Sequence, residues 1–69
     1  MDFTASSRQR QAEWFLELGR DELAAGRAHA ALTSAQLAIA LWPYEPVAIA
    51  ARALTCEALA RANQRSTPT

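Results

Sequence analysis

The side chains that could support chemistry in this chain are one cysteine, one histidine and a group of carboxylates within residues 13–22. A reactive thiol needs an accessible, electropositive setting, whereas Cys56 stands among apolar residues, which predicts a small buried hydrophobe. His29 has no serine, cysteine or carboxylate at a spacing that would make it a general base. The carboxylates recur at helical spacing, which is typical of a solvated face. We therefore expect no enzymatic activity, no metal site and no cofactor.

The length of the chain limits the core that it can form. Its 69 residues make one domain at most, and a chain of this size buries only about 60% of the surface that its unfolded form exposes. Small domains are usually reinforced by disulfides or metal ions, but a single cysteine cannot form an internal disulfide. Association with a partner protein, or with a second copy of the chain, is the remaining source of stability.

The charge balance argues against nucleic acid as a partner. Seven basic and seven acidic residues give a formal net charge of zero, whereas binding to phosphates needs a basic surface. The N-terminal segment MDFTASSRQRQ has no apolar signal region, and no run approaches the roughly 20 apolar residues of a membrane span. We therefore expect no membrane insertion and a cytoplasmic location.

The elements that must position these residues are helices, because apolar residues recur at helical spacing in three segments and nothing resembles a strand. The first helix is expected to begin at Ser6 or Ser7, since Ser6 and Gln9 have the spacing of a capping box. It is expected to stop at Gly26, because glycine adopts the left-handed conformation of a helix end at little cost. Its apolar stripe comprises Trp14, Phe15, Leu16, Leu18 and Leu23.

Two prolines delimit the other helices. The second helix should run from about Ala28 to Leu41, because Pro43 disfavours helix at the residue before it. Pro46 suits the first position of a third helix, which should continue to about Asn63. The short connections make consecutive helices antiparallel neighbours. The expected organisation is a flexible N-terminus over residues 1–6, a single three-helix domain over 7–63 and a disordered tail over 64–69.

The first two helices resemble a tetratricopeptide repeat, a helix-turn-helix unit of 34 residues. Aromatic, leucine and glycine residues at the matching positions of the first helix, and small residues and a closing proline in the second, carry this resemblance: Phe15, Leu18, Gly19, Gly26, Ala31, Leu32, Ala38 and Pro43. Glu22 and Ala35 stand where the family usually has large apolar residues, which predicts a thin core. The resemblance implies an all-α fold of one helical hairpin, with a third helix like the first helix of a next repeat.

A finer resemblance concerns the start of the chain, the position of the glycines and the closing proline. Arg8, Gln9, Gln11, the apolar run from Trp14 to Leu18, Gly19, Gly26 and Pro43 are similar to the small tetratricopeptide-type chaperones of bacterial type III secretion, especially the YscY kind. Those proteins bind a component of the export apparatus through helical contacts. The resemblance implies the same kind of role for this chain.

Analogy with tetratricopeptide repeats also implies a ligand-facing side. It would contain Glu13, Leu16, Arg20, Leu23 and Ala24 of the first helix with Val47, Ala50, Leu54 and Glu57 of the third. Adjacent residues lie about 100° apart around a helix, so Phe15 is expected in the core and Trp14 at the rim of the binding surface. Leu18, Gly19, Gly26, Ala31, Ala38 and Pro43 are expected to serve packing, with Gly19 allowing two helices to approach closely.

Three functions compete. The first is a small adaptor or chaperone that covers an apolar or amphipathic helical segment of another protein, with Leu16, Leu23, Val47 and Leu54 as anchors, Arg20 setting the orientation and Trp14 at the rim. The second is a structural homo-oligomer, in which the third helix stacks on a neighbouring copy. The third is a helix-turn-helix DNA-binding protein, but AHAALTSAQLAIAL offers too few side chains that could contact phosphates or base edges.

Overall fold

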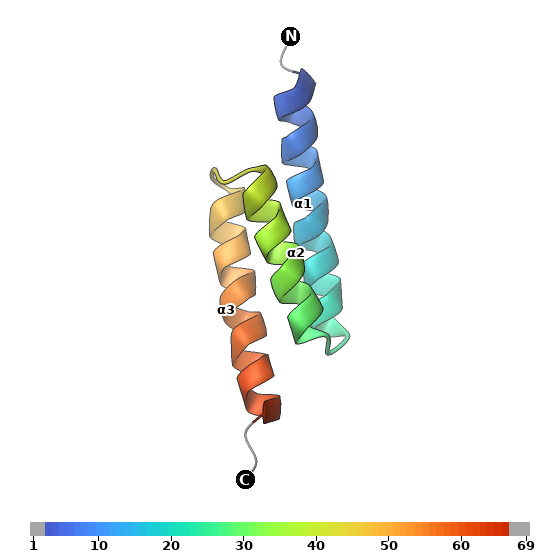
Figure 1. Cartoon of the computed structure of the whole chain (residues 1–69), viewed down its shortest axis with the longest axis vertical. Helices are drawn as coiled ribbons and strands as arrows, with labels where there is room; N and C mark the ends of the chain where they lie inside the picture. The colour runs from blue at the N-terminus through green and yellow to red at the C-terminus, as the bar shows by residue number, and fades with distance from the viewer. Residues whose placement is uncertain (1–2, 67–69) are drawn as a thin grey trace.

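The computed structural model describes the backbone of residues 3–66 and the side chains of residues 7–64, and within that part of the chain the fold is all-α. Three helices follow one another: α1 spans Phe3–Ala24, α2 spans Ala28–Leu41 and α3 spans Val47–Ser66. Figure 1 shows α1 and α3 running in the same direction, with α2 antiparallel to both. The prediction of a helical hairpin followed by a third helix is confirmed.

The outer ends of α1 and α3 lie beyond the predicted boundaries. α1 begins at Phe3 and not at Ser6 or Ser7, and α3 continues through residues 64–66 to Ser66. Neither extension contains a glycine or proline, and serine within a helix costs only a few tenths of a kcal/mol, about 0.5 relative to alanine. The capping-box spacing of Ser6 and Gln9 therefore does not mark the helix start. Residues 1–2 and 67–69, also predicted to be flexible or disordered, lie outside the described residues.

The end of α1 is set by Gly26, as the sequence predicted. Gly26 has a φ of +84°, which places it in the left-handed region that favours glycine. Its amide donates to the carbonyl of Leu23 at 3.0 Å, and the amide of Arg27 donates to the carbonyl of Glu22 at 2.8 Å. This pair of hydrogen bonds is the Schellman arrangement, which satisfies carbonyl groups that a helix end would otherwise leave unpaired.

The prolines delimit α2 and α3 nearly as predicted. Trp42, which precedes Pro43, has φ −149° and ψ 87°, outside the helical range, as expected for a residue before proline. The carbonyl of Pro46 accepts a hydrogen bond from the amide of Ala50 at 3.1 Å. Pro46 therefore directly precedes the first helical residue of α3, one position earlier than predicted. In the connection, the rings of Trp42 and Tyr44 make an edge-on contact with centroids 5.0 Å apart.

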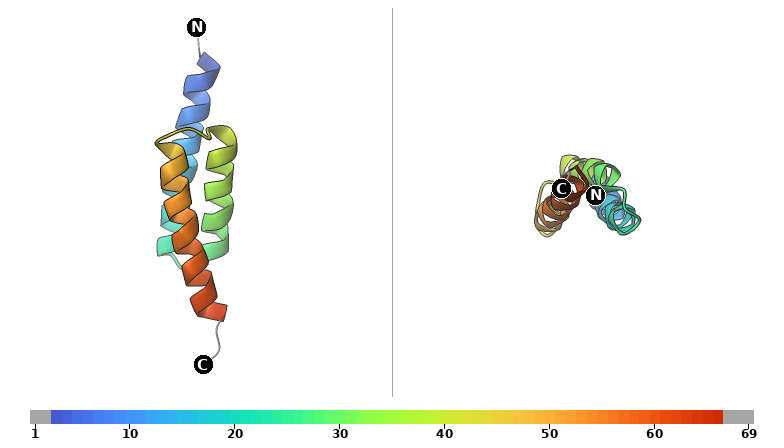
Figure 2. Two further views of the ribbon diagram at one scale, coloured as in Figure 1. Left: turned by 90° about the vertical axis from the view of Figure 1, so that its left-hand side faces the viewer. Right: turned by 90° about the horizontal axis from the view of Figure 1, so that it is seen from below.

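The three helices form an arch with α2 at its apex. Seen end-on, α1 and α3 diverge from α2 (Figure 2), and both pack mainly against it. The overlap is staggered, because α1 extends past α2 at its N-terminal end while α3 extends past it in the opposite direction (Figure 1). The molecule consequently measures 56 × 18 × 13 Å along its principal axes. Its short dimensions are little more than one or two helix diameters of about 10 Å.

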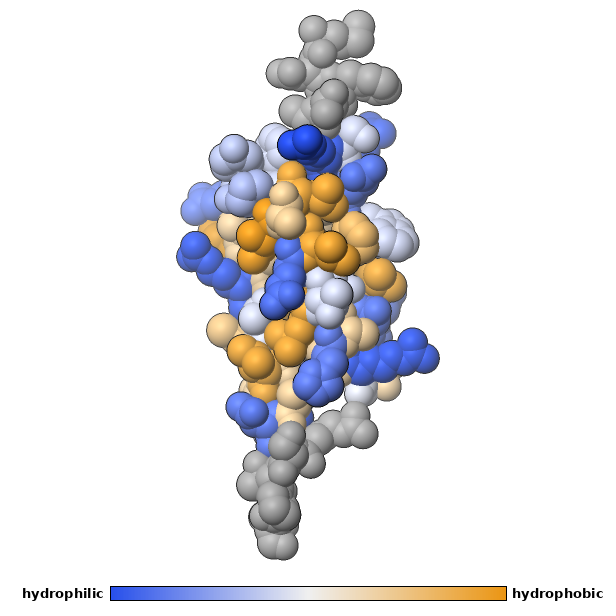
Figure 3. Space-filling model, viewed as in Figure 1, coloured by the Kyte–Doolittle hydropathy of each residue, from blue (hydrophilic) through white to orange (hydrophobic). Residues whose placement is uncertain are grey.

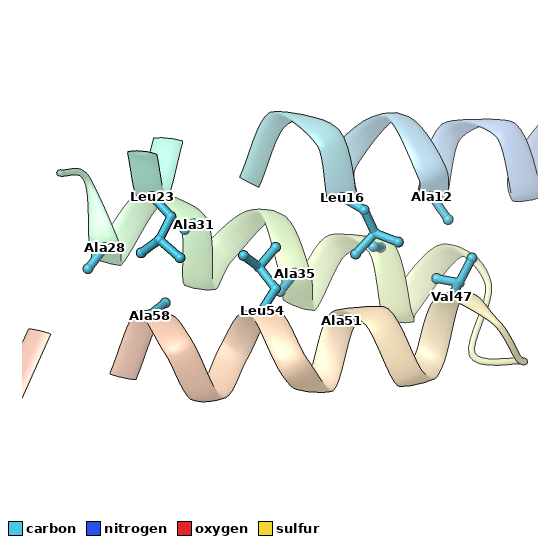
Figure 4. Packing of buried hydrophobic residues seen from close by; sticks show 11 residues of the cluster. Ala12, Leu16, Leu23, Ala28, Ala31, Ala35, Val47, Ala51, Leu54 and Ala58 are labelled. Carbon is cyan, nitrogen blue, oxygen red and sulfur yellow. The ribbon is translucent and has the colours of Figure 1, made fainter. Parts of the chain in front are cut away.

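The core between the helices is built mostly from alanine. Of the eleven buried hydrophobic residues among the described side chains, seven are alanine, and the only larger residue below 2% exposure is Val47. Ala31 and Ala35 of α2 lie beside Leu23 of α1 and Leu54 of α3 (Figure 4), so the helices approach one another closely. Ala35, one of the two residues from which the sequence predicted a thin core, is fully buried. Because the helix backbones lie close together, small side chains are enough to fill the core.

Candidate protein-binding groove

The four apolar residues predicted to anchor a partner lie in the core of the chain itself. Leu16 and Leu23 of α1 are each 5% exposed, and Val47 and Leu54 of α3 are 1% and 3% exposed. Figure 4 shows the side chains of Leu16 and Leu23 directed toward α3, and those of Val47 and Leu54 directed toward α1. They lie between the two helices and pack in one cluster with the buried alanines of α2. The structure thus gives them a packing role that the sequence interpretation did not assign to them.

The outer edges of these four residues form the floor of a shallow groove between α1 and α3. Two hollows follow one another along it. The first hollow is lined by Glu13, Leu16, Glu17, Arg20, Pro46, Val47 and Ala50. The second hollow is lined by Arg20, Leu23, Ala24, Ala50, Ala53, Leu54, Glu57 and Arg61. Arg20 and Ala50 belong to both hollows, and the alanine side chains are short enough to leave room for a side chain from outside.

Charged side chains stand along the walls of the groove. Glu13, Glu17, Arg20 and Glu57 are exposed, and within the described side chains none of them makes an ion pair. Arg61 is also exposed, and its Nη1 donates to the carbonyl of Leu23 near the end of α1 at 3.4 Å. The first hollow carries two carboxylates and one guanidinium, whereas the second carries two guanidinium groups and one carboxylate. The groove is therefore acidic at one end and basic at the other.

The predicted packing residues are distributed over the seams between helices. Ala31 and Ala38 are fully buried, Phe15 and Leu18 are half-buried, and Pro43 is exposed in the connection. Gly19 is buried where all three helices meet: a Cβ atom added to it would lie 2.6 Å from Cδ2 of Leu54 and 3.3 Å from Cβ of Ser34. The prediction that Gly19 serves close helix packing is confirmed.

A polar contact between α1 and α2 was missed by the sequence interpretation. Ser34 is 4% exposed and its hydroxyl donates to Oε1 of Glu22 at 2.6 Å. The sequence interpretation took Glu22 only as a residue that thins the core. The signal for the pair was a serine on the otherwise alanine face of α2, since a buried hydroxyl needs a partner.

Several large apolar side chains lie outside the groove. Trp14 is 58% exposed and meets Phe15 edge-on, with ring centroids 5.1 Å apart, but it lines neither hollow. The other exposed large hydrophobic residues are Leu37, Tyr44, Ile49 and Leu59. Figure 3 shows hydrophobic side chains, with hydrophilic ones between them, on the face of the molecule where α2 lies in front.

The side chains with potential for chemistry are dispersed. Cys56 is exposed, so the prediction that it is buried is wrong. His29 is exposed as well. Among the described residues, no group of three or more His, Cys, Asp or Glu side chains could hold a metal ion, and no helix is long and apolar enough to span a membrane. The described surface thus offers a groove and several exposed apolar side chains.

Comparison of this chain with protein-family models, with curated proteins and with solved structures gives no match.

Proposed function

We propose that this chain is a protein–protein interaction module, a small tetratricopeptide-like adaptor or chaperone that covers a helical segment of a partner protein in the groove between α1 and α3. The observation that carries the proposal is the groove itself, where short alanine side chains leave two hollows beside four charged groups that have no partner within the described part of the chain. A helix with apolar anchors would fill the hollows while its polar residues met those charges.

The large exposed surface of the chain supports a role in association. A compact protein of 7.5 kDa exposes about 4,250 Å², whereas this chain exposes 5001 Å². The excess of roughly 750 Å² reflects the elongated, staggered arrangement of the three helices (Figure 1). Burial of part of this surface by a partner would stabilise the arch, in which α1 and α3 pack mainly against α2.

The resemblance to small type III secretion chaperones suggests a component of an export apparatus as the partner. The partner can be identified by mass spectrometry after isolation of the tagged chain from the cell that produces it. Two variants make the experiment specific. Ala53→Leu adds volume at an exposed position of the second hollow, and Ala40→Leu makes the same change at an exposed position of α2 that lines neither hollow.

We expect a partner to be retained by the unmodified chain and by Ala40→Leu, and to be lost with Ala53→Leu, because the added side chain occupies the space of an anchor. Circular dichroism should show that both variants keep the helical content of the unmodified chain, since both substitutions add a good helix former at an exposed site. Equal retention of the partner by the two variants would show that it binds another surface, and would refute the proposal that the groove is the binding site.

A second candidate function, a structural homo-oligomer, is favoured by the outer face of α3. Ile49 and Leu59 are 56% and 47% exposed on this helix, and α3 packs against α2 and α1 only. A second copy could cover this face. Analytical ultracentrifugation of the pure chain separates the two proposals: a stable dimer that dissociates in an Ile49→Glu variant supports the homo-oligomer, and a monomer supports the adaptor.

A further inference from the structure

We infer that the groove reads a specific pattern in a helical partner: two apolar anchors seven residues apart, an acidic residue between them that pairs with Arg20, and a basic residue before the first anchor. This inference rests on the proposed function, because it specifies the occupant of the same groove. It is carried by the spacing of the two hollows and by the order of the charges along their walls.

The spacing of the hollows sets the spacing of the anchors. The floor of the first hollow contains Leu16 and Val47, and the floor of the second contains Leu23 and Leu54. On each helix the two floor residues are seven positions apart, which corresponds to about 10.5 Å along the helix axis. α1 and α3 run in the same direction (Figure 1). A partner helix lying along them therefore meets floor residues at the same seven-residue spacing on both sides. Residues i and i+7 of a helix share one face, so such a pair can enter both hollows.

Arg20 lies between the hollows and determines the residue between the anchors. Its side chain is exposed, lines both hollows and makes no ion pair among the described side chains. A partner residue at i+3 or i+4 would face this guanidinium. A carboxylate there would form a charge-assisted contact, whereas a lysine would place two like charges together at the centre of the groove.

The charges at the two ends of the groove determine the direction of the partner helix. Glu13 and Glu17 flank the first hollow, and Arg61 stands at the far end of the second. The positive N-terminal end of a helix is stabilised by nearby carboxylates and its negative C-terminal end by nearby cations. The partner helix should therefore run parallel to α1, with its basic residue beside Glu13 and Glu17.

Stapled helical peptides test the pattern with the intact chain. Each probe carries leucines at i and i+7, a staple on its solvent face that equalises helicity, and glutamate, glutamine or lysine at i+4. A further pair of probes carries lysine either one turn before the first leucine or one turn after the second. Fluorescence anisotropy measures their affinities for the unmodified chain, for Arg20→Glu and for Arg52→Glu, a control at an exposed arginine of α3 that lines neither hollow.

We expect Arg20→Glu to weaken binding of the glutamate probe by about fivefold and to strengthen binding of the lysine probe by about fivefold, in keeping with exposed ion pairs. Arg52→Glu should change neither affinity. The probe with lysine before the first anchor should bind more tightly than the probe with lysine after the second, and 0.5 M salt should reduce the difference because it screens exposed charges.

The outcomes separate this inference from the function on which it rests. If all probes bind the unmodified chain but respond equally to Arg20→Glu and Arg52→Glu, or if the order of charges has no effect, the recognition pattern is wrong while the groove stands. The neutral glutamine probe tests the groove itself. A dissociation constant weaker than about 1 mM, or equal affinity for the Ala53→Leu variant, would overturn the groove and the recognition pattern together.

Discussion

The hydrogen bond between Ser34 and Glu22 shows how a single polar pair is accommodated in a core of alanine. The hydroxyl of Ser34 is almost inaccessible to water, whereas Glu22 is half-buried and can keep part of its carboxylate solvated. A short bond of 2.6 Å to a carboxylate is stronger than a neutral hydrogen bond. The pair therefore joins α1 to α2 through a polar contact inside an otherwise apolar seam.

Ser34→Ala should lower the free energy of unfolding by about 1 kcal/mol, because it removes this bond while leaving the packing volume nearly unchanged. Combination with Glu22→Ala should give a coupling energy of about 1 kcal/mol in a double-mutant cycle, measured by urea unfolding. Thr33→Ala is a suitable control, since the exposed hydroxyl of Thr33 donates only to the carbonyl of His29 in its own helix at 3.2 Å. Additive effects of the two substitutions would contradict an energetic role for the pair.

Whether a residue could be placed correctly from the sequence depended on how local its determinants are. Gly26 acts on its own backbone and Pro43 on the residue before it, so the ends of the first two helices were predicted correctly. Cys56 was misplaced because its neighbours in the sequence are apolar, although it lies about 200° around the helix from the buried Leu54. The roles of Leu16 and Val47 depend on the angle between α1 and α3. Helical periodicity shows that such residues share a face, and not whether a neighbouring helix or a partner covers it.

The approach of the three helices at Gly19 fixes the shape of the arch. A methyl group at this position would meet Leu54 of α3 at 2.6 Å and Ser34 of α2 at 3.3 Å, so both neighbours would have to move. Leu54 is 3% exposed, and the end of its side chain can move away only toward the second hollow, which it lines. The glycine therefore allows α1 to contact both other helices at the same level, and α1 and α3 converge there to close the floor of the groove.

Gly19→Ala should destabilise the fold even though alanine is the better helix former. The gain in helix propensity is about 0.8–1.0 kcal/mol, whereas overpacking of a tight core costs about 1–3 kcal/mol. We expect a net loss of about 1 kcal/mol in the free energy of unfolding, together with weaker binding of the neutral probe as α1 and α3 separate. An increase in stability would show that the helices adjust freely and that the close approach is not required.

At the scale of the whole molecule, the exposed surface and the alanine core imply limited stability. A core of this size supplies about 3–5 kcal/mol, and few of its side chains are larger than a methyl group. Urea unfolding of the pure chain, followed by circular dichroism, should give a free energy of unfolding within or below that range. Saturating probe peptide should increase it by about 2.7 kcal/mol at a hundredfold excess over the dissociation constant. A free energy of unfolding above about 8 kcal/mol that does not change when the probe is added would contradict a fold that is completed by binding.

The stagger of α1 and α3 has a practical consequence for joining this chain to other proteins. α1 and α3 project from opposite ends of a molecule that is 56 Å long (Figure 1). A helix fused in register directly before Phe3, or directly after Ser66 in place of residues 67–69, would continue outward without crossing the arch. Two attached domains would then be held apart along one axis while the bundle stays folded, and their separation could be adjusted in steps of about 1.5 Å per added residue.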